Sequence, residues 1–408
     1  MPDRNGFAPK DSPGFRRSVL CHMSCALCTI RENCRPMSLH LIPATEDMGA
    51  LLAAILEEHA VPFARSHDLF SIDNPGDHNR LIALLRQVLS GPERQDVSVL
   101  TGEVSGRFPA THSLDDWWRI QQTGWFSDAL AGDGFETWFQ PIVDTGSQKI
   151  IAHECLIRLN AGRLYSGGEI VDAARTRNEI HAFDSYARRL AIRSAARQGT
   201  GGKYFVNFMP SSIYNPEHCM KSTLETLAES GLKPEQIVFE VVESDLVRDP
   251  AHLRRICDYY RSRGFGFALD DVGTGSNSLQ MVCDLHPDFI KLDKSLIEKI
   301  EQPMYAATIG KLVELASQFR LAVIAEGVEK PETMENLWLL GVHCMQGYFF
   351  GRPSPRITRQ SRDIGQPDPN SADQATQMLD PDLVNLSKSL AAACEPTSLP
   401  PSHSLLRH

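Results

Sequence analysis

The sequence predicts a (β/α)8 barrel over residues 113–355, preceded by a small α+β domain and followed by a disordered tail. The length of 408 residues is enough for two or three domains. Between residues 135 and 352, strand-like apolar runs alternate with segments of helical period, which is typical of a largely parallel sheet. Eight such units in about 220 residues fit a closed barrel.

The composition excludes several classes of protein. Apolar residues make up 42% and charged residues 23%, as in ordinary globular domains. The longest apolar stretch, residues 50–56, is far shorter than the roughly 20 residues that cross a bilayer, so we expect no membrane span. The formal charge of −10, with no long basic run, argues against a nucleic-acid polymer as partner. A phosphate-bearing small ligand is compatible with this charge if divalent cations neutralise the acids locally.

The leader, residues 1–36, contains a cluster of four of the ten cysteines: Cys21, Cys25, Cys28 and Cys34. The other six are scattered, so the pattern is not a disulfide framework and indicates a reducing compartment. The spacing fits a zinc ion or an iron–sulfur cluster, and four unliganded thiols are the alternative. The first three cysteines have the spacing found in radical S-adenosylmethionine enzymes, but such an enzyme needs a barrel of its own, and the one predicted barrel carries other motifs. His22 interrupts the apolar run of a secretory signal, so we expect a cytoplasmic protein.

The next region, residues 37–101, predicts a small regulatory or sensory domain. Its elements occur in the order βαββαβ of a split βαβ sandwich. The strands and helices are expected at residues 38–42, 48–59, 63–72 (two strands with a hinge at 67–68), 77–89 and 97–101. Residues 102–112 read as a linker, and the helix with Trp117 and Trp118 is expected to dock onto the next domain of the chain. Residues 356–408 have the polar, proline-rich composition of a disordered tail.

The barrel region supplies the eight predicted strands. They are expected at residues 137–143, 150–156, 204–208, 237–242, 266–269, 289–292, 322–325 and 344–350. The helices between them include residues 170–197, 252–263, 305–319 and 332–340.

Polar residues close seven of these strands, at the end where barrels of this type carry their chemistry. They are Glu154, Asn207, Glu240, Glu243, Asp270, Asp271, Lys291, Asp293, Glu326, Glu329 and Gln346. Salt bridges at solvated strand ends would explain one such residue. They would not explain six consecutive strands that each end in a residue able to bind a metal ion or transfer a proton. Converging carboxylates need cations to neutralise them, and oxygen ligands suit Mg²⁺ or Mn²⁺.

Eight sequence blocks occur in a fixed order across this region. They are Gln140-Pro-Ile-Val-Asp, Glu154-Cys-Leu-Ile-Arg, the block around Asn207, Glu240-Val-Val-Glu-Ser, Asp270-Asp-Val-Gly-Thr-Gly, Lys291-Leu-Asp, Ala325-Glu-Gly-Val-Glu and Gln346-Gly-Tyr. With these blocks, residues 113–355 resemble the EAL family of cyclic di-GMP phosphodiesterases.

The resemblance implies hydrolysis of cyclic di-GMP to linear pGpG with two Mg²⁺ or Mn²⁺ ions, in a homodimer that forms through the barrel. It implies that Glu154, Asn207, Glu240 and Asp270 hold one ion. Asp270, Asp271 and Glu326 would hold the other. By the same resemblance Lys291, Glu326 and Glu243 serve catalysis, with Glu243 ordering the loop at residues 271–278. The implied substrate contacts are Gln140, Arg158, Asp293 and Gln346.

The sequence departs from the family pattern at several positions. Cys155 stands where the family has Ala, and Ser276-Asn277 replace the usual Tyr-Ser in the loop that couples the metal site to the dimer interface. We therefore expect altered rate or regulation. A non-catalytic cyclic di-GMP receptor is the alternative of a different class. A two-metal hydrolase of another phosphodiester is a third hypothesis, because strand-end chemistry does not name the base.

Overall fold

The structure is a computed structural model that describes residues 38–72, 78–101, 111–199, 201–242, 250–273 and 278–357. The chain divides into two compact units, Met1–Gln121 and Gln122–His408. Among the described helices, none has the length and apolar composition that a membrane span requires.

The first unit is an antiparallel sheet with helices packed on it, in strand order β2-β3-β1-β4-β5. Its elements are β1 (Leu39–Pro43), α1 (Glu46–Glu58), β2 (Ala64–Ser66), β3 (Leu69–Ile72), α2 (His78–Val88), α3 (Gly91–Gln95), β4 (Val97–Thr101), β5 (His112–Ser113) and α4 (Leu114–Gln122). The register places Leu41 beside Phe70 and Val99, in one core with apolar residues of α1 and α2. The predicted βαββαβ order is thus confirmed.

The helix α4 packs differently from the sequence expectation. Leu114 and Trp117 are buried in the core of the first unit. Asp115 forms ion pairs with Arg86 (2.8 Å) and Arg94 (3.0 Å) of the same unit. Leu114 and Trp117 therefore pack within the first unit, and the two compact units divide after Gln121. Residues 102–110 of the predicted linker lie outside the described residues.

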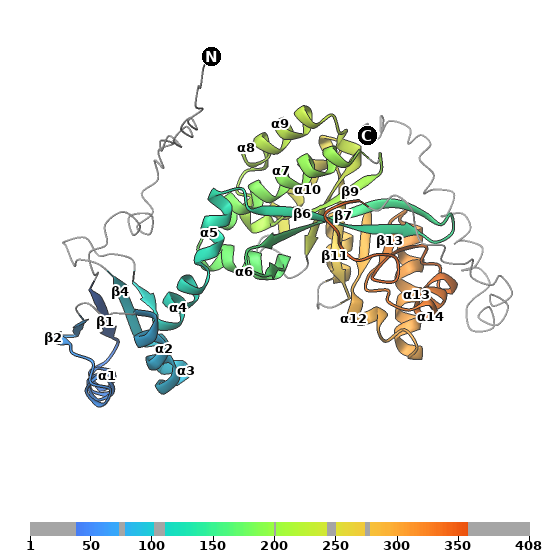
Figure 1. Ribbon diagram of the computed structural model, residues 1–408. Helices are drawn as coiled ribbons and strands as arrows, with labels where there is room; N and C mark the ends of the chain where they lie inside the picture. The colour runs from blue at the N-terminus through green and yellow to red at the C-terminus, as the bar shows by residue number, and fades with distance from the viewer. Residues whose placement is uncertain are drawn as a thin grey trace, which may run out of the picture. The chain divides into compact units, whose positions relative to one another are not determined.

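The second unit contains the barrel (Figure 1). Its elements before the fourth barrel strand are α5 (Gly124–Ala131), β6 (Phe135–Asp144), β7 (Lys149–Asn160), β8 (Leu164–Tyr165), α6 (Gly167–Thr176), α7 (Ile180–Gln198), β9 (Lys203–Asn207), the 3-10 turn η2 (Pro210–Ser212), α8 (Pro216–Cys219), α9 (Lys221–Ser230) and the 3-10 turn η3 (Pro234–Gln236). Then come β10 (Ile237–Val242), α10 (Pro250–Ser262), β11 (Gly266–Val272), α11 (Ser278–Leu285), β12 (Phe289–Leu292), α12 (Lys294–Ile297), α13 (Pro303–Gln318), β13 (Ala322–Ala325), α14 (Pro331–Leu339) and β14 (Cys344–Gln346).

The predicted eight-stranded barrel is confirmed. Its strands pair in the order β6-β14-β13-β12-β11-β10-β9-β7, and β7 pairs with β6 to close the ring. The other seven barrel strands are parallel to one another, but β6 runs antiparallel to both of its neighbours. The carboxyl ends of seven strands and the amino end of β6 therefore meet at one rim, which we call the mouth.

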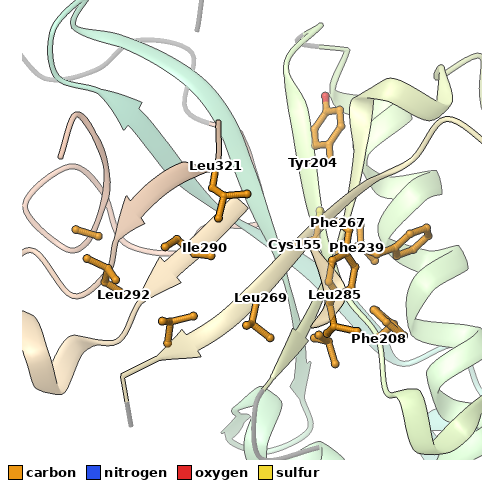
Figure 2. Packing of buried hydrophobic residues seen from close by; sticks show 14 of the residues in the cluster. Cys155, Tyr204, Phe208, Phe239, Phe267, Leu269, Leu285, Ile290, Leu292 and Leu321 are labelled. Carbon is orange, nitrogen blue, oxygen red and sulfur yellow. The ribbon is translucent and has the colours of Figure 1, made fainter. Parts of the chain in front are cut away.

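Two apolar layers hold the barrel together. Alternate strand residues point outward against the helices, where Phe208, Phe239 and Phe267 pack edge to face (Figure 2). The residues between them point inward and form an inner cluster of Ile142, Ala152, Phe205, Val238, Ala268, Ile324 and Cys344, with Phe289 packed against it. This filled interior is the floor beneath the mouth.

Two of the differences between the observed and the predicted element boundaries have a clear local cause. The predicted helix over residues 170–197 is two helices, α6 and α7, because Asn178 adopts a left-handed φ of 56° between them. The last strand ends at Gln346 rather than 350. Gly347 turns the chain there, and a Cβ at this position would lie 2.0 Å from the backbone oxygen of Val328.

Candidate active site

Eight side chains form one polar layer at the mouth, with one residue on or directly after each barrel strand. Each is two residues from a member of the inner apolar cluster or, for Lys291, from Phe289. Because side chains alternate along a strand, each therefore points inward, one step nearer the mouth. These residues are Gln140, Glu154, Asn207, Glu240, Asp270, Lys291, Glu326 and Gln346. The structure thus brings together eight of the residues that the sequence analysis selected.

Lys291 lies at the centre of this layer, and its side chain is 1% exposed. Its Nζ is 2.5 Å from Oε1 of Glu326, 2.9 Å from Oε1 of Glu240, 3.2 Å from Oδ1 of Asp270 and 3.5 Å from Oε2 of Glu154. Asp271 is a fifth carboxylate beside them. Among the described residues of the layer, acids therefore greatly outnumber the single ammonium.

The neighbouring acids Asp270 and Asp271 both reach the site because the strand is irregular there. In a regular strand, consecutive side chains point to opposite faces. The register of β11 shifts between Leu269 and Val272, and Asp271 has a left-handed φ of 57°. This bulge turns both carboxylates toward the mouth, where oxygens of Asp270, Asp271 and Glu326 lie within 4.8 Å of one another.

Amide side chains orient Glu154. Asn207 Nδ2 donates to Oε1 of Glu154 at 3.3 Å, and Gln346 Nε2 donates to Oε2 at 2.6 Å. Gln346 Nε2 also lies 3.0 Å from Oε1 of Gln140, whose own Nε2 donates to the carbonyl of Gly351. Every residue has a backbone carbonyl, so the role of the one at Gly351 could not be predicted from the sequence.

Burial changes the protonation of the layer. It raises the pKa of Glu240 well above its usual value, and it raises the pKa of Glu326 to about 8. Burial and the neighbouring Asp270 raise the pKa of Asp271 to about 6. Burial acts to lower the pKa of Lys291, but the surrounding carboxylates outweigh it and raise that pKa well above its usual value. Lys291 therefore keeps its proton, while Glu240, Glu326 and Asp271 hold theirs more tightly than usual.

The donor set fits divalent metal ions. Buried acids in excess of nearby cations are costly, and a bound cation removes that cost. The oxygens of Asp270, Asp271 and Glu326 are close enough to share an ion. Carboxylate and amide oxygens are the ligands that Mg²⁺ and Mn²⁺ prefer.

Other selected residues are not part of the polar layer. Arg158 of β7 is half-buried and donates Nη1 to the carbonyl of Ile157 at 2.8 Å. Asp293 accepts from the backbone N–H of Ser295 and so caps α12. Glu329 is exposed and pairs with Lys294 at 2.7 Å.

Several predictions fall outside the described residues. They concern Glu243, Ser276, Asn277, Cys21, Cys25, Cys28 and Cys34. The role of Glu243 and the zinc or iron–sulfur site of the cysteines therefore stay predictions. The same holds for the tail beyond residue 357.

The family model described as EAL domain matches residues 123–353. Among curated proteins, the chain is 30% identical over 227 residues to the cyclic di-GMP phosphodiesterase RocR of Pseudomonas aeruginosa, covering 54% of this chain and 58% of RocR. It is 28% identical over 238 residues to the probable cyclic di-GMP phosphodiesterase PdeN of Escherichia coli, covering 56% of this chain and 45% of PdeN. The chain thus spans less than two thirds of the length of these relatives.

Solved structures agree with this match. A standalone EAL protein of Vibrio cholerae, in its c-di-GMP bound form, is 32% identical with a TM-score of 0.53, covering 56% of this chain and 95% of that one. BlrP1 of Klebsiella pneumoniae, in a calcium and cyclic di-GMP complex, shares the fold at 20% identity and a TM-score of 0.52, covering 80% of this chain and 99% of that one. With the family model matched across more than half of its length, the chain belongs to the EAL domain family.

Proposed function

We propose that this protein hydrolyses cyclic di-GMP to linear pGpG with Mg²⁺ or Mn²⁺. The observation that carries the proposal is the polar layer, in which buried carboxylates outnumber Lys291 at the mouth of an EAL barrel. The relatives RocR and PdeN, named as a cyclic di-GMP phosphodiesterase and a probable one, support the choice of substrate.

Two groups of ligands can hold the metal ions. Glu154, Asn207, Glu240 and Asp270 come from neighbouring strands β7, β9, β10 and β11, and they would hold one ion. Asp270, Asp271 and Glu326 would hold the second, with Asp270 shared. When bound, two such ions activate water and neutralise charge on the phosphate that is attacked.

The side chains Lys291 and Glu326 suit the chemical step. Lys291 stays protonated, so its Nζ can stabilise negative charge that develops on the phosphate oxygens. Glu326 lies 2.5 Å from this Nζ, so its carboxylate can hold the ammonium in place beside the proposed metal site.

The substrate contacts are proposed on separate grounds. The guanidinium of Arg158 has the planar geometry that binds phosphate oxygens in pairs. Gln140 and Gln346 are 8% and 3% exposed and bond to each other, so we propose that they act mainly by orienting Glu154. Asp293 would keep α12 in place at the mouth.

The test is incubation of the purified protein with cyclic di-GMP and Mn²⁺, with products separated by chromatography. We expect linear pGpG from the native protein and none from the Asp270→Asn variant, which loses an anionic ligand at nearly constant shape. Tight binding without any pGpG over hours would instead favour a non-catalytic receptor. Competition by cyclic di-AMP and by linear dinucleotides tests whether the substrate is another phosphodiester.

A further inference from the structure

A second buried ion pair lies outside the polar layer, on α7. Asp184 and Arg188 are 2% and 1% exposed, and Nη1 of Arg188 lies 2.8 Å from Oδ2 of Asp184. Neither residue belongs to one of the eight sequence blocks of the barrel. Tyr260 of α10 also interacts with Arg188.

The carboxylate of Asp184 holds the loop after β9. Its Oδ1 accepts from the backbone N–H of Met209 at 2.9 Å, and its Oδ2 accepts from the hydroxyl of Ser212 at 2.5 Å. Met209 is only two residues beyond Asn207, the amide that donates to Glu154 in the polar layer. Asp184 therefore fixes the backbone just past a proposed metal ligand.

Further contacts restrain the same stretch from other sides. The backbone N–H of Phe208 donates to the carbonyl of Glu240, which continues the pairing of β9 with β10. A ring nitrogen of His181 lies 2.8 Å from the carbonyl of Ser212, and one of His252 lies 2.5 Å from that of Ile213. With β10 on one side and Asp184 on the other, the backbone at residues 207–209 has little freedom to turn.

Stability alone is a weak reason for burying such a pair. Removing two charges from water is costly, and replacing a buried ion pair by apolar residues of similar size is often neutral or stabilising. A polar group with several geometrically defined bonds does, however, select one conformation of the segment it binds. The two bonds from the loop to Asp184 are of this kind.

We infer that Asp184, paired with Arg188, is a positioning residue that fixes the β9 loop so that Asn207 is aimed at the metal site. The inference rests on the proposed function in one respect, the assignment of Asn207 as a metal ligand. It predicts that loss of the Asp184 bonds weakens metal binding even where the fold is intact. Residues that orient metal ligands typically contribute 10–100-fold to affinity or activity, so we expect an effect of about that size.

The main test is the double variant Asp184→Leu/Arg188→Met, which removes both charges together and so leaves neither unpaired. Because the buried N–H of Met209 loses its acceptor, we expect a folded protein with a somewhat lower melting temperature. We also expect faster hydrogen–deuterium exchange at residues 208–213 in the metal-free protein, and Mn²⁺ affinity lowered by about 10–100-fold in calorimetry. The turnover number should fall by a similar factor at saturating cyclic di-GMP. Tyr260→Phe is the matched control, because it removes the hydroxyl near Arg188 and leaves the bonds from Asp184 to the loop.

Ser212→Ala provides a milder variant that keeps both charges, in case the double variant does not fold. It should lower Mn²⁺ affinity in the same direction by a few-fold, because one of the two loop bonds to Asp184 remains. A folded variant with native exchange at residues 208–213, or with native Mn²⁺ affinity, would overturn the inference. If the native protein binds Mn²⁺ but does not cleave cyclic di-GMP, the proposed function fails, and the exchange and affinity data still decide the role of Asp184.

Discussion

Two buried cations in the barrel unit, Lys291 and Arg188, have opposite charge environments. Lys291 lies within 3.5 Å of four carboxylates of the described residues. Arg188 is ion-paired, among those residues, with Asp184 alone. The first group has more acids than its single ammonium can pair with, an excess that protons or a metal ion can neutralise, whereas the second is neutral as a pair. In this barrel, the excess of acids around Lys291 indicates a cation-binding site, and the balanced Asp184–Arg188 pair indicates a structural role.

The bonding of the acids sharpens the contrast. Asp184 directs its oxygens to a backbone N–H and a hydroxyl as well as to Arg188, so its surroundings satisfy it. Glu240 is fully buried, and burial raises its pKa well above the usual value. An acid that is buried without enough donors is stabilised by a proton or by a metal ion. Substitutions can therefore disturb the charged layer and the structural pairs separately.

The largest expected effect is from Glu154→Ala. This carboxylate accepts from Asn207 and Gln346 and faces Lys291, so its loss removes a metal ligand and the partner of two amides. We expect hydrolysis of cyclic di-GMP to fall by at least about two orders of magnitude, and nucleotide binding to fall less. Glu298→Ala, at an exposed carboxylate beside α12, is the control and should keep native turnover. Near-native turnover of the Glu154 variant would show that the metal assignment is wrong.

Lys291→Met should lower the turnover number by up to about 100-fold, an effect no larger than that of Glu154→Ala. If Lys291 acts in the transition state, turnover stays low at saturating Mn²⁺ while metal and substrate still bind. If Lys291 only balances charge, excess Mn²⁺ restores turnover, and that rescue would refute the catalytic role. Lys294→Met, three residues on and 47% exposed, is the matched control.

The third prediction concerns pH in the absence of nucleotide. The pKa values of Glu326 (about 8) and Asp271 (about 6) lie above their usual values, so the folded protein binds protons that the unfolded chain releases. Metal-free protein should therefore melt at a lower temperature at about pH 8 than at about pH 6. Mn²⁺ must displace these protons, so its affinity should rise by about tenfold per pH unit for each proton displaced.

Calorimetry and melting curves with EDTA or Mn²⁺ at the two pH values check this prediction. Glu326→Gln cannot ionise at that position, so it should show a weaker pH dependence of both quantities. Mn²⁺ affinity that does not change between the two pH values would contradict the proton displacement.

Much of the site was predictable because the period of a strand is simple. Counting in twos from the apolar floor leads to polar residues such as Glu154, Asn207 and Glu240, and the sequence analysis found them as strand ends. The alternation of side chains does not reveal the direction of a strand, so only the residue pairing in the structure showed that β6 is antiparallel. The bulge that turns both Asp270 and Asp271 inward depends on the left-handed φ of Asp271, and two consecutive Asp residues in a sequence do not predict that angle.

The Asp184 pair was not predictable for a different reason. On a helix with several arginines, Arg188 resembles its neighbours Arg189 and Arg193 in sequence. Its burial depends on how α7 packs against the β9 loop and α10, which is a property of the tertiary structure. Local sequence patterns predict which face of a helix is apolar, but they do not predict which charged side chain is buried.

The smallest expected effect concerns the exposed ion pairs of Lys294. Lys294 pairs with Glu329 at 2.7 Å and with Glu298 at 3.4 Å, but these side chains are 46–58% exposed. Exposed ion pairs contribute about 0–1 kcal/mol, because water screens the charges and ordering the side chains costs entropy. Lys294→Ala should therefore change the free energy of unfolding by less than about 1 kcal/mol, measured by urea denaturation. A loss of several kcal/mol would contradict this prediction. It would mean that the exposed pairs of Lys294 stabilise the segment after β12 as strongly as a buried ion pair would.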